Sequence, residues 1–387
     1  MEVRHSMTKL FKFAPAIVGF FLTSAFAQAQ NESGVGSKEV LVGMVNNTSG
    51  PTATSGLNFN AGPRAYFEQL NKAGGIHGRL VAVKYYDDAY EPEKAAAETK
   101  RAIQDDHVFV IMNNNGTPTA KAALPIAKRA NVPFLFPRTG DMSVREPFDP
   151  LIFNWRSSFG QEITALVKHA VAVEKKKRIA ILTQTDAFGT SIRSAALKAL
   201  RDHNLGSFAA EGEVPRNSVE VEKALEKIES GNPDVVILGV TQAAAVPFLK
   251  LAATKKKTWI YLSANNNNPI AEKLSDAEIA NVIISQVTPN PDTSSLMVAK
   301  KFREDMKATG NEKFLNPIAF EGYINAWLFA DVLRTAGPQP TRASLIKAFE
   351  TKPYDVGGLK IKFSSQNHNA DLPVQLTRVK GGKFHDI

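Results

Sequence analysis

Short apolar runs alternate with helical patterns along most of this chain. In the first part, the runs predicted as strands are VLVGMV (40–45), LVAVKYYD (80–87), VFVIM (108–112) and VPFLF (132–136). The helices predicted between and after them run from about Asn60 to Ala73, onward from Pro92, and from Thr119 to Ala130. Short strands that alternate with helices are typical of parallel sheets with right-handed crossovers.

A second series of the same kind begins with a predicted helix from Phe159 to Lys175. Its predicted strands are 178–183, 207–214, 234–239, 258–263 and 281–287. The alternation then gives way to three helical segments and two closing strands, at 294–308, 318–336, 341–350, 359–364 and 373–379. We therefore predict an α/β protein with two doubly wound lobes. The lobes are predicted to join near 154–158 and 285–291, where the pattern resets.

The N-terminus carries a different pattern. Arg4, Lys9 and Lys12 precede the largely apolar stretch Phe13–Phe26, and small residues follow it. This order predicts a cleaved signal peptide over residues 1–29, because the apolar stretch is too short for a stable membrane anchor. The sequence contains no cysteine, which excludes disulfides and a lipid-modified cysteine. Export without either predicts a soluble protein of a bacterial periplasm, with no lipid anchor.

The net charge of +9 changes this picture little. Basic residues cluster in two short runs, Lys175–Arg178 and Lys255–Lys257, and each run lies between a predicted helix and a predicted strand. Positive charge is favoured at a helix C-terminus by the helix dipole. No aromatic residues are interleaved with the lysines to stack on bases. We therefore predict no nucleic-acid partner.

Hydroxyl, amide and glycine residues follow the predicted strands. Ligands of doubly wound sheets bind beyond the carboxyl ends of the strands, so these exits are the candidate site. The exits are 46–56, 113–119, 137–141, 184–190, 240–244 and 264–268.

The exit NNNGT (113–117) leads directly into a predicted helix. A helix N-terminus presents free backbone N–H groups and the positive end of the dipole, which suits a carboxylate-sized anion. Gly116 allows close approach of the backbone, and Thr117 and Thr119 add hydroxyl groups. The alternative is an ordinary helix cap, in which the Thr117 side chain satisfies its own helix.

The residues at the exits predict binding rather than catalysis. Asp141 and Asp186 are the only carboxylates among them, and no histidine occurs there. The sequence lacks the serine elbow, the phosphate loop and the dinucleotide fingerprint, and its histidines are not spaced as zinc ligands. The acidic stretch 85–98 is predicted to be a strand end followed by a capped helix rather than a calcium loop, since it lacks the alternating ligands and central glycine of such loops. We expect no enzyme activity, no cofactor and no metal.

Several stretches, taken together and in order, resemble a known family. They are SGPTATSG, NKAGGIHGRLVAVKYYDDAYEPEKAAAE, GTPTAKAALPIAKRANVPFLFPRTG, TDAFGTSI and AFEGYINAWLFADVLRTAG. The chain looks like the branched-chain amino-acid-binding (Leu/Ile/Val-binding-like, type I) family of periplasmic substrate-binding proteins, which serve ABC importers. The similarity runs from about Val40 to the C-terminus.

This resemblance implies two Rossmann-like lobes joined by a three-crossing hinge, with the ligand enclosed between them. Lobe 1 is then expected over 38–156 plus 287–370, and lobe 2 over 157–286 plus 371–387. The resemblance also implies a small-molecule ligand, an ABC permease in the inner membrane as partner, and a monomer.

The family pattern also implies a binding site. In members that bind amino acids, the loops matching 113–117 and 138–140 hold the ligand carboxylate, and an aromatic residue at the position of Phe188 covers the side chain. An acidic residue in the loop matching 264–268 receives the ammonium group, but here that loop is ANNNN. This departure and the loss of a common tyrosine near Thr241 argue against an α-amino-acid ligand. The predicted ligand-binding residues are Asn114, Asn115, Gly116, Thr117, Arg138, Thr139, Gly140, Phe188, Thr241 and Asn265.

The roles of two basic residues stay open at this point. Arg138 either pairs with a ligand carboxylate or forms a salt bridge with Asp141 or Glu146. Arg156, with Trp155, lies at the predicted join between the lobes, where packing is the default and contact with the cleft is the alternative.

Two residues of TDAFGT also have two interpretations. Phe188 is either a lid over the ligand or an apolar anchor for its loop. Asp186 either accepts a hydrogen bond from the ligand or caps a helix that starts near Thr190, and the cap is the favoured interpretation.

These observations predict a periplasmic solute-binding protein of an ABC importer. It would capture a small organic, carboxylate-bearing ligand between two closing lobes. The alternative is a ligand-sensing module of a membrane receptor or kinase, which uses the same fold. An enzyme is disfavoured because the strand exits carry almost no acid–base groups.

Overall fold

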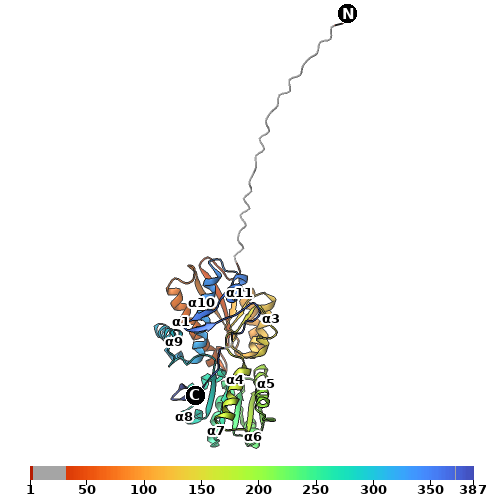
Figure 1. Ribbon diagram of the computed structural model, residues 1–387, viewed down its shortest axis with the longest axis vertical. Helices are drawn as coiled ribbons and strands as arrows, with labels where there is room; N and C mark the ends of the chain where they lie inside the picture. Colours follow the sequence, from red (N-terminus) through yellow and green to blue (C-terminus); the bar gives the residue numbers. More distant parts are fainter. Residues whose placement is uncertain (3–31, 371) are drawn as a thin grey trace. The chain divides into compact units, whose positions relative to one another are not determined.

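In the computed structural model, which describes residues 1–2, 32–370 and 372–387, five parallel strands form a first sheet in the order β2-β1-β3-β4-β5 (Figure 1). The strands are β1 (Glu39–Asn46), β2 (Leu80–Asp87), β3 (Val110–Met112), β4 (Phe134–Leu135) and β5 (Ile152–Phe153). The predicted signal peptide lies outside the described residues, apart from its first two positions, and so do the side chains of residues 265–267. No helix within the described ranges is long and apolar enough to span a membrane.

Helices cover both faces of this first sheet. Those that pack on it are α1 (Ala53–Lys72), α2 (Pro92–Gln104), α3 (Thr117–Arg129), α9 (Met297–Ala308), α10 (Pro317–Ala336) and α11 (Arg342–Thr351). One apolar core joins the sheet to α1, α9, α10 and α11, and another joins it to α2 and α3. Two short strands, β11 (Tyr354–Val356) and β12 (Leu359–Ile361), form a small antiparallel hairpin near α10.

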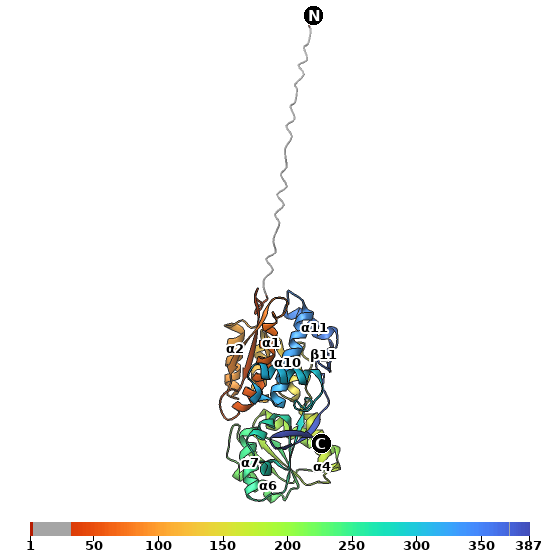
Figure 2. The ribbon, with the colours of Figure 1, turned by 90° about the vertical axis from the view of Figure 1, so that its left-hand side faces the viewer.

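Helices α1 and α10 lie side by side on the first sheet (Figure 2). A Cβ atom on Gly62 would lie 1.9 Å from the carbonyl oxygen of Ala319, and one on Gly322 would lie 2.4 Å from that of Phe59. Only glycine therefore allows the two backbones to approach this closely. Most residues of α10 are buried.

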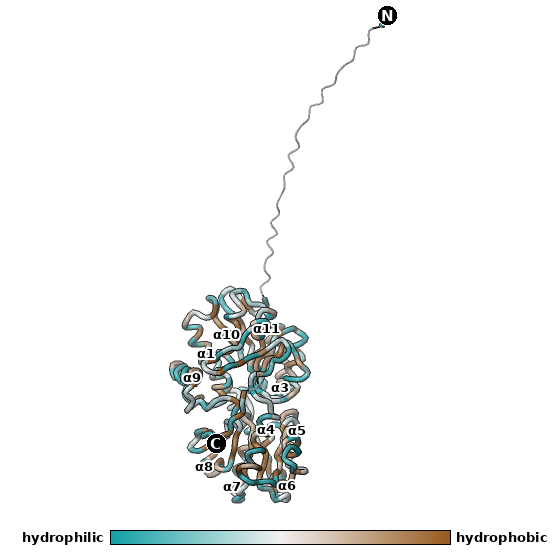
Figure 3. The backbone as a smooth tube through the Cα atoms, in the orientation of Figure 1, coloured by the Kyte–Doolittle hydropathy of each residue, from teal (hydrophilic) through white to brown (hydrophobic). Residues whose placement is uncertain are grey.

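Seven strands within the described chain form a second sheet, in the order β14-β13-β10-β9-β8-β6-β7. The strands are β6 (Ile179–Gln184), β7 (Glu211–Val214), β8 (Val235–Gly239), β9 (Ile260–Ser263), β10 (Val282–Gln286), β13 (Gln375–Lys380) and β14 (Lys383–Asp386), and the β10–β13 and β13–β14 pairings are antiparallel. The helices around it are α4 (Phe159–Ala172), α5 (Ala187–Asp202), α6 (Glu222–Ser230), α7 (Gln242–Thr254) and α8 (Asp276–Ile279). Its central strands are buried on both faces and are largely apolar (Figure 3).

Within the described part, the chain passes between the two sheets three times. The crossings connect β5 to α4, β10 to α9, and β12 to β13. The first and third crossings are hydrogen-bonded to each other, because the backbone N–H of Asn154 donates to the carbonyl of His368 at 2.8 Å. Arg156, in the first crossing, is paired with Glu162 of α4 and Glu321 of α10, so one buried side chain contacts both halves of the molecule.

The predicted α/β class, with two parallel sheets and a three-crossing connection, is confirmed. The residue limits of the two lobes stay a prediction. The first helix was placed wrongly: α1 begins at Ala53, because its small and polar first turns are partly buried, with Gly56 close against the backbone of Asn47. Helix α5 likewise begins at Ala187 rather than near Thr190. The short strands β5, β11 and β14 were not predicted, since two to four residues carry too little pattern.

Candidate functional site

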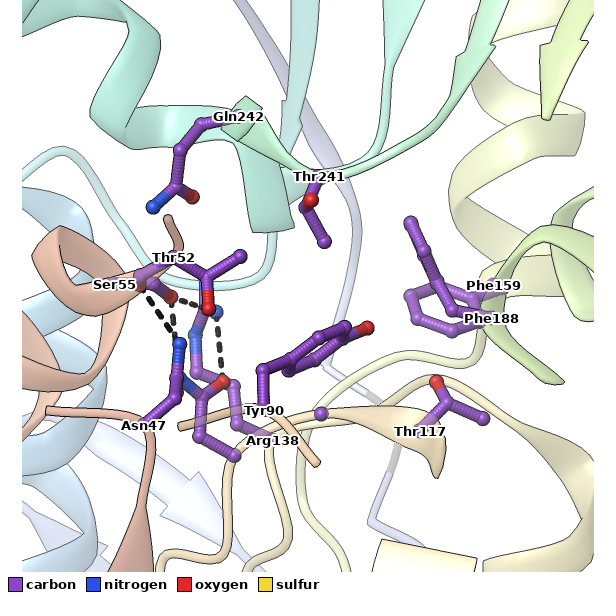
Figure 4. Close-up of a pocket in the computed structure, with 12 residues that line it drawn as sticks. Asn47, Thr52, Ser55, Tyr90, Thr117, Arg138, Phe159, Phe188, Thr241 and Gln242 are labelled. Atoms are coloured by element: carbon purple, nitrogen blue, oxygen red, sulfur yellow. Dashed lines mark hydrogen bonds between the residues drawn. The ribbon is translucent and has the colours of Figure 1, made fainter. Parts of the chain in front are cut away.

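A cavity lies where the carboxyl ends of the two sheets face each other. Its empty volume, including space open to solvent, is about 360 Å³. The lining residues are Asn47, Thr52, Ser55, Tyr90, Asn115, Gly116, Thr117, Arg138, Phe159, Phe188, Thr241 and Gln242. Figure 4 shows Asn47, Ser55 and Arg138 on the side of the first sheet, and Thr241 and Gln242 opposite them.

The first-sheet side of the cavity is a connected hydrogen-bond network. Asn115, after β3, donates its Nδ2 to Asn47 Oδ1 at 2.6 Å and to Ser55 Oγ at 3.2 Å. Arg138, after β4, donates Nη1 to the same Ser55 oxygen and to Asn115 Oδ1, each at 3.2 Å. Because Ser55 Oγ receives two donors, its own hydroxyl proton is left to donate toward the cavity.

Arg138 belongs to a buried ionic cluster. Its Nε lies 3.3 Å from Glu321 Oε2, and Arg156 joins Glu321 to Glu162 through contacts of 3.2 Å. Burial lowers the pKa of Arg138 to about 10, while the carboxylate of Glu321 acts to raise it. The guanidinium therefore stays charged at neutral pH. The predicted salt-bridge partners, Asp141 and Glu146, were wrong, since the partner comes from α10 on a distant part of the chain.

Helix α3 begins at the cavity wall without a side-chain cap. Gly116 is the N-cap residue with φ of 113°, and the Thr117 hydroxyl lies 2.7 Å from that of Thr139 instead of capping its own helix. The described residues offer no acceptor for the backbone N–H groups of Thr117 and Thr119. The ordinary-cap interpretation is therefore wrong, and the helix presents free donors as the anion hypothesis requires.

Gly116 also makes room for an aromatic wall. A Cβ atom there would lie 2.5 Å from the Tyr90 ring. Tyr90 has φ of 64°, and the turn that holds it is pinned by Asp87 and Asp88, whose carboxylates accept from the N–H groups of Ala89 and Tyr90. The acidic stretch 85–98 is thus a strand end, a turn that positions Tyr90 and the start of α2, as predicted, but the predicted side-chain cap of that helix is absent, because Glu91 at the N-cap does not bond to its first turn.

The second-sheet side combines aromatic rings with polar groups. Phe188 of α5 and Phe159 of α4 pack edge to face with centroids 5.3 Å apart. Thr241 precedes α7 and donates its backbone N–H to Gln184 Oε1 at 3.0 Å. The side-chain atoms Thr241 Oγ1 and Gln242 Nε2, and Thr52 Oγ1 from the opposite side, are buried without a hydrogen-bond partner in the described part of the chain. Buried polar atoms of this kind are what a bound polar molecule would satisfy.

Contacts outside the cavity hold the two sides together. Glu91, at the start of α2, accepts hydrogen bonds from Arg216 and from Asn217, the latter at 2.9 Å. On another side, Asn58 of α1 donates to Glu272 Oε1 at 3.1 Å. The first-sheet side and the second-sheet side therefore contact each other directly at two places outside the cavity.

Six of the predicted ligand residues line this one cavity: Asn115, Gly116, Thr117, Arg138, Phe188 and Thr241. Three others lie behind it. Asn114 donates to the carbonyl of Val45, Thr139 supports Thr117, and the Gly140 carbonyl accepts from Phe159 N–H. The side chain of Asn265 lies outside the described residues. Binding by all ten stays a prediction.

Asp186 has the favoured role of a helix cap. Its Oδ1 accepts the backbone N–H groups of Phe188 and Gly189 at 2.9 and 3.1 Å. The carboxylate thereby fixes the first turn of α5, which carries Phe188 to the cavity.

Sequence reasoning missed six lining residues: Asn47, Thr52, Ser55, Tyr90, Phe159 and Gln242. The first three lie in the polar exit after β1, and Gln242 follows Thr241, so the strand-exit rule contained the signal for these four. Tyr90 reaches the cavity only through a left-handed turn, and Phe159 through the crossing before α4. Neither is marked by a local pattern.

Comparison with known proteins agrees with this geometry. Residues 39–383 match the sequence pattern of the family described as periplasmic binding protein. A Leu/Ile/Val-binding protein homolog of Brucella melitensis is 25% identical over 227 residues, 57% of this chain and 58% of that protein, so the match spans little more than half of the relative.

Solved structures match over more of the chain. A possible leucine/isoleucine/valine-binding protein from Rhodopirellula baltica has a TM-score of 0.84 at 25% identity, covering 93% of this chain and 98% of that one. A substrate-binding periplasmic protein from Ralstonia solanacearum has a TM-score of 0.83 at 27% identity, covering 90% and 99%. The resemblance inferred from the sequence motifs is confirmed. The chain belongs to the periplasmic binding protein family and has the type I fold of the Leu/Ile/Val-binding-like proteins.

Proposed function

We propose that this protein captures a small, carboxylate-bearing organic solute in the periplasm and delivers it to an ABC permease of the inner membrane. The observation that carries the proposal is the donor-rich cavity between the two sheets. Its described lining contains one charged residue, the cation Arg138, and no carboxylate. Because Arg138 is paired with Glu321, the site would favour an anion through its hydrogen-bond donors rather than through net charge.

A carboxylate would find its donors on the first-sheet side. The Ser55 hydroxyl, the Thr117 backbone N–H and the Arg138 guanidinium come from three different strand exits. They combine a charged donor with neutral donors at a helix start, which is an effective arrangement for an anion. Arg138 is already paired with Glu321, so it would contribute directed hydrogen bonds more than net charge.

Ligand binding would be coupled to the contact between the two sides. Residues that follow strands of both sheets line the cavity. A ligand that contacts residues from both sides therefore stabilises the closed arrangement of the protein. The Glu91 and Asn58 contacts outside the cavity add to this arrangement without touching the ligand. We propose that the permease recognises this closed form.

A thermal-shift screen of refolded, ligand-free protein tests the proposal. The panel contains amino acids, aliphatic and aromatic carboxylates, and the matching neutral amides. A carboxylate at 100 times its dissociation constant raises the apparent stability by about 2.7 kcal/mol, whereas its amide does not. Silence from every carboxylate, or equal response to acid and amide, would overturn the ligand class.

The transport role needs a second measurement. Uptake of a radiolabelled hit should fall when the protein is removed from the cell and recover when it is restored. Unchanged uptake combined with a lost transcriptional response to the same compound would instead identify a sensing module.

A further inference from the structure

We infer that the ligand is a carboxylate without an ammonium group that carries a second, uncharged oxygen acceptor, as α-keto acids do. This inference rests on the proposed function, because it names the chemical class of solute for the same cavity. It follows from the balance of donors and acceptors among the residues that line the site, and from the buried polar atoms that the protein itself does not satisfy.

The cavity offers donors on both sides. On the first-sheet side, the Ser55 hydroxyl and the Thr117 N–H are free to donate. Tyr90 Oη lies 3.4 Å from Gln184 Nε2, which donates to it, so the phenol proton is also left to donate. Burial raises the pKa of Tyr90 well above its ordinary value, so the hydroxyl keeps this proton. Opposite, Gln242 contributes a buried Nε2 without a partner in the described chain.

Acceptors are few by comparison. An ammonium group brings three donors and a charge, and it needs several acceptors, preferably ionised, to leave water. Among the described lining residues, the side-chain oxygens that accept no hydrogen bond within the described chain include the hydroxyls of Thr52 and Thr241 and the amide oxygen of Gln242, all of them neutral.

The backbone oxygens around the cavity are largely engaged. Those that already accept at least one hydrogen bond are the carbonyls of Thr52, Asn115, Gly116, Arg138 and Thr241. The nearby carboxylate of Asp186 caps α5 and receives Gln184, and it does not line the cavity.

The second acceptor of the ligand is required by the far side of the cavity. Gln242 is 2% exposed and Thr241 is 8% exposed, and both face the space opposite Ser55 and Arg138 (Figure 4). An aliphatic or aromatic body suits the wall formed by Tyr90 and Phe188, but it would leave the Gln242 amide unsatisfied. A buried amide without a partner costs free energy, and a ligand oxygen removes that cost.

Binding of three sets of ligands to the refolded protein, measured by calorimetry, tests the inference. Each set is a triad of an amino acid, a keto acid and a plain acid that share one carbon skeleton. The triads are leucine, α-ketoisocaproate and isocaproate; phenylalanine, phenylpyruvate and phenylpropionate; and glutamate, α-ketoglutarate and glutarate. In the skeleton that fits the cavity, the keto acid should bind at least about 100-fold more tightly than the amino acid, because the ammonium loses hydration without an acceptor. The plain acid should bind about tenfold more weakly than the keto acid, because it leaves a buried donor unpaired.

The outcomes separate this inference from the proposed function. An amino acid that binds as tightly as its keto acid overturns the inference and leaves the carboxylate proposal standing. A plain acid that equals its keto acid overturns the second acceptor. Failure of every member of all three triads, together with the wider carboxylate panel, overturns both.

The variant Gln242→Glu should reverse the preference for the keto acid over the amino acid. Gln242→Glu places a carboxylate where the unpartnered amide lies, so it should tighten the amino acid and weaken the keto acid, each by at least about tenfold. Gln339→Glu is the matched control, because Gln339 is exposed in the loop after α10, and it should change neither. A Gln242→Glu protein that melts like the wild type and keeps the wild-type preference would contradict the inference. If it does not fold, the wild-type triads decide alone.

Discussion

Arg138 Nε lies 3.3 Å from Glu321 Oε2, and both side chains are only 2% exposed. Glu321 also holds Arg156, which in turn holds Glu162, so four alternating charges lead from the cavity wall to the first crossing between the sheets. The formal charges of this cluster cancel. The cluster therefore fixes the direction of the Arg138 guanidinium and connects a candidate ligand contact to the hinge.

Breaking this cluster from one side should destabilise the protein strongly. Arg138→Met or Glu321→Gln is expected to lower the free energy of unfolding of ligand-free protein by about 3–5 kcal/mol, since each leaves a buried charge poorly compensated. The double variant Arg138→Met/Glu321→Gln should lose less than the sum of the single losses. Urea denaturation measures all three.

An exposed pair gives the control. Arg193 and Glu211 are 2.6 Å apart but 42% and 35% exposed, so Arg193→Ala should cost about 1 kcal/mol or less. If Arg138→Met costs no more than this, the cluster does not hold the site.

Gly116→Ala should damage the cavity directly. The residue has φ of 113°, and its new methyl group would lie 2.5 Å from the Tyr90 ring and 2.9 Å from Thr119 Oγ1. Backbone strain of this kind costs about 1–3 kcal/mol, and displacement of Tyr90 should weaken ligand binding. Gly206→Ala is the control, because nothing lies within 4 Å of its added methyl group. Equal melting temperatures and equal ligand affinities for the two variants would contradict the prediction.

Asp88 should make stability depend on pH. It is fully buried, its Oδ1 accepts the N–H of Tyr90 at 2.8 Å, and its Oδ2 has no partner in the described chain. Burial raises the pKa of Asp88 from 3.8 to about 7, with the nearby Asp87 and Glu91 adding to the rise and Lys94 opposing it. The folded state thus binds this proton more tightly than the unfolded state does.

The sign of the pH effect follows from this difference. The stabilisation by the proton is complete below the unfolded pKa of 3.8 and is lost as the pH rises toward the folded value of about 7, by up to about 1.4 kcal/mol per pH unit. Asp88→Asn keeps the acceptor for Tyr90 and removes the titration. Its stability advantage over the wild type should therefore grow between about pH 4 and pH 7 and then level off. Asp105→Asn, at an exposed position, is the control. Its free energy of unfolding should differ from that of the wild type by the same amount at every pH of the series.

The contact of Glu91 with Arg216 and Asn217 should strengthen ligand binding without touching the ligand. Glu91→Gln removes the charge from a partly exposed ion pair, so we expect an affinity about two- to fivefold weaker, with a smaller difference at high salt. Glu93→Gln on the same helix is exposed and has no such partner across the cavity among the described contacts. Stopped-flow dissociation rates that are identical for the two variants would show that this contact does not support closure.

The sequence by itself determined the architecture and one half of the site. Strands buried on both faces, such as β6 and β8, appear as unbroken apolar runs, and their alternation with helices predicts parallel sheets. Because ligands bind at the carboxyl ends of such strands, the loops with Asn115, Thr117 and Arg138 could be located without a structure.

Only the tertiary structure decided which groups face the cavity and which hold the others in place. Glu321, the partner of Arg138, is contributed by α10, and Tyr90 enters the cavity through a left-handed turn fixed by the buried carboxylate of Asp88. The start of α1 at Ala53, which brings Thr52 and Ser55 to the site, packs closely against the loop after β1, where a Cβ on Gly56 would lie 2.2 Å from the carbonyl oxygen of Asn47. The pairing of Arg138 with Glu321 joins segments far apart in the chain. Local periodicity reports which face of an element is buried, but it carries no information on which distant element covers that face.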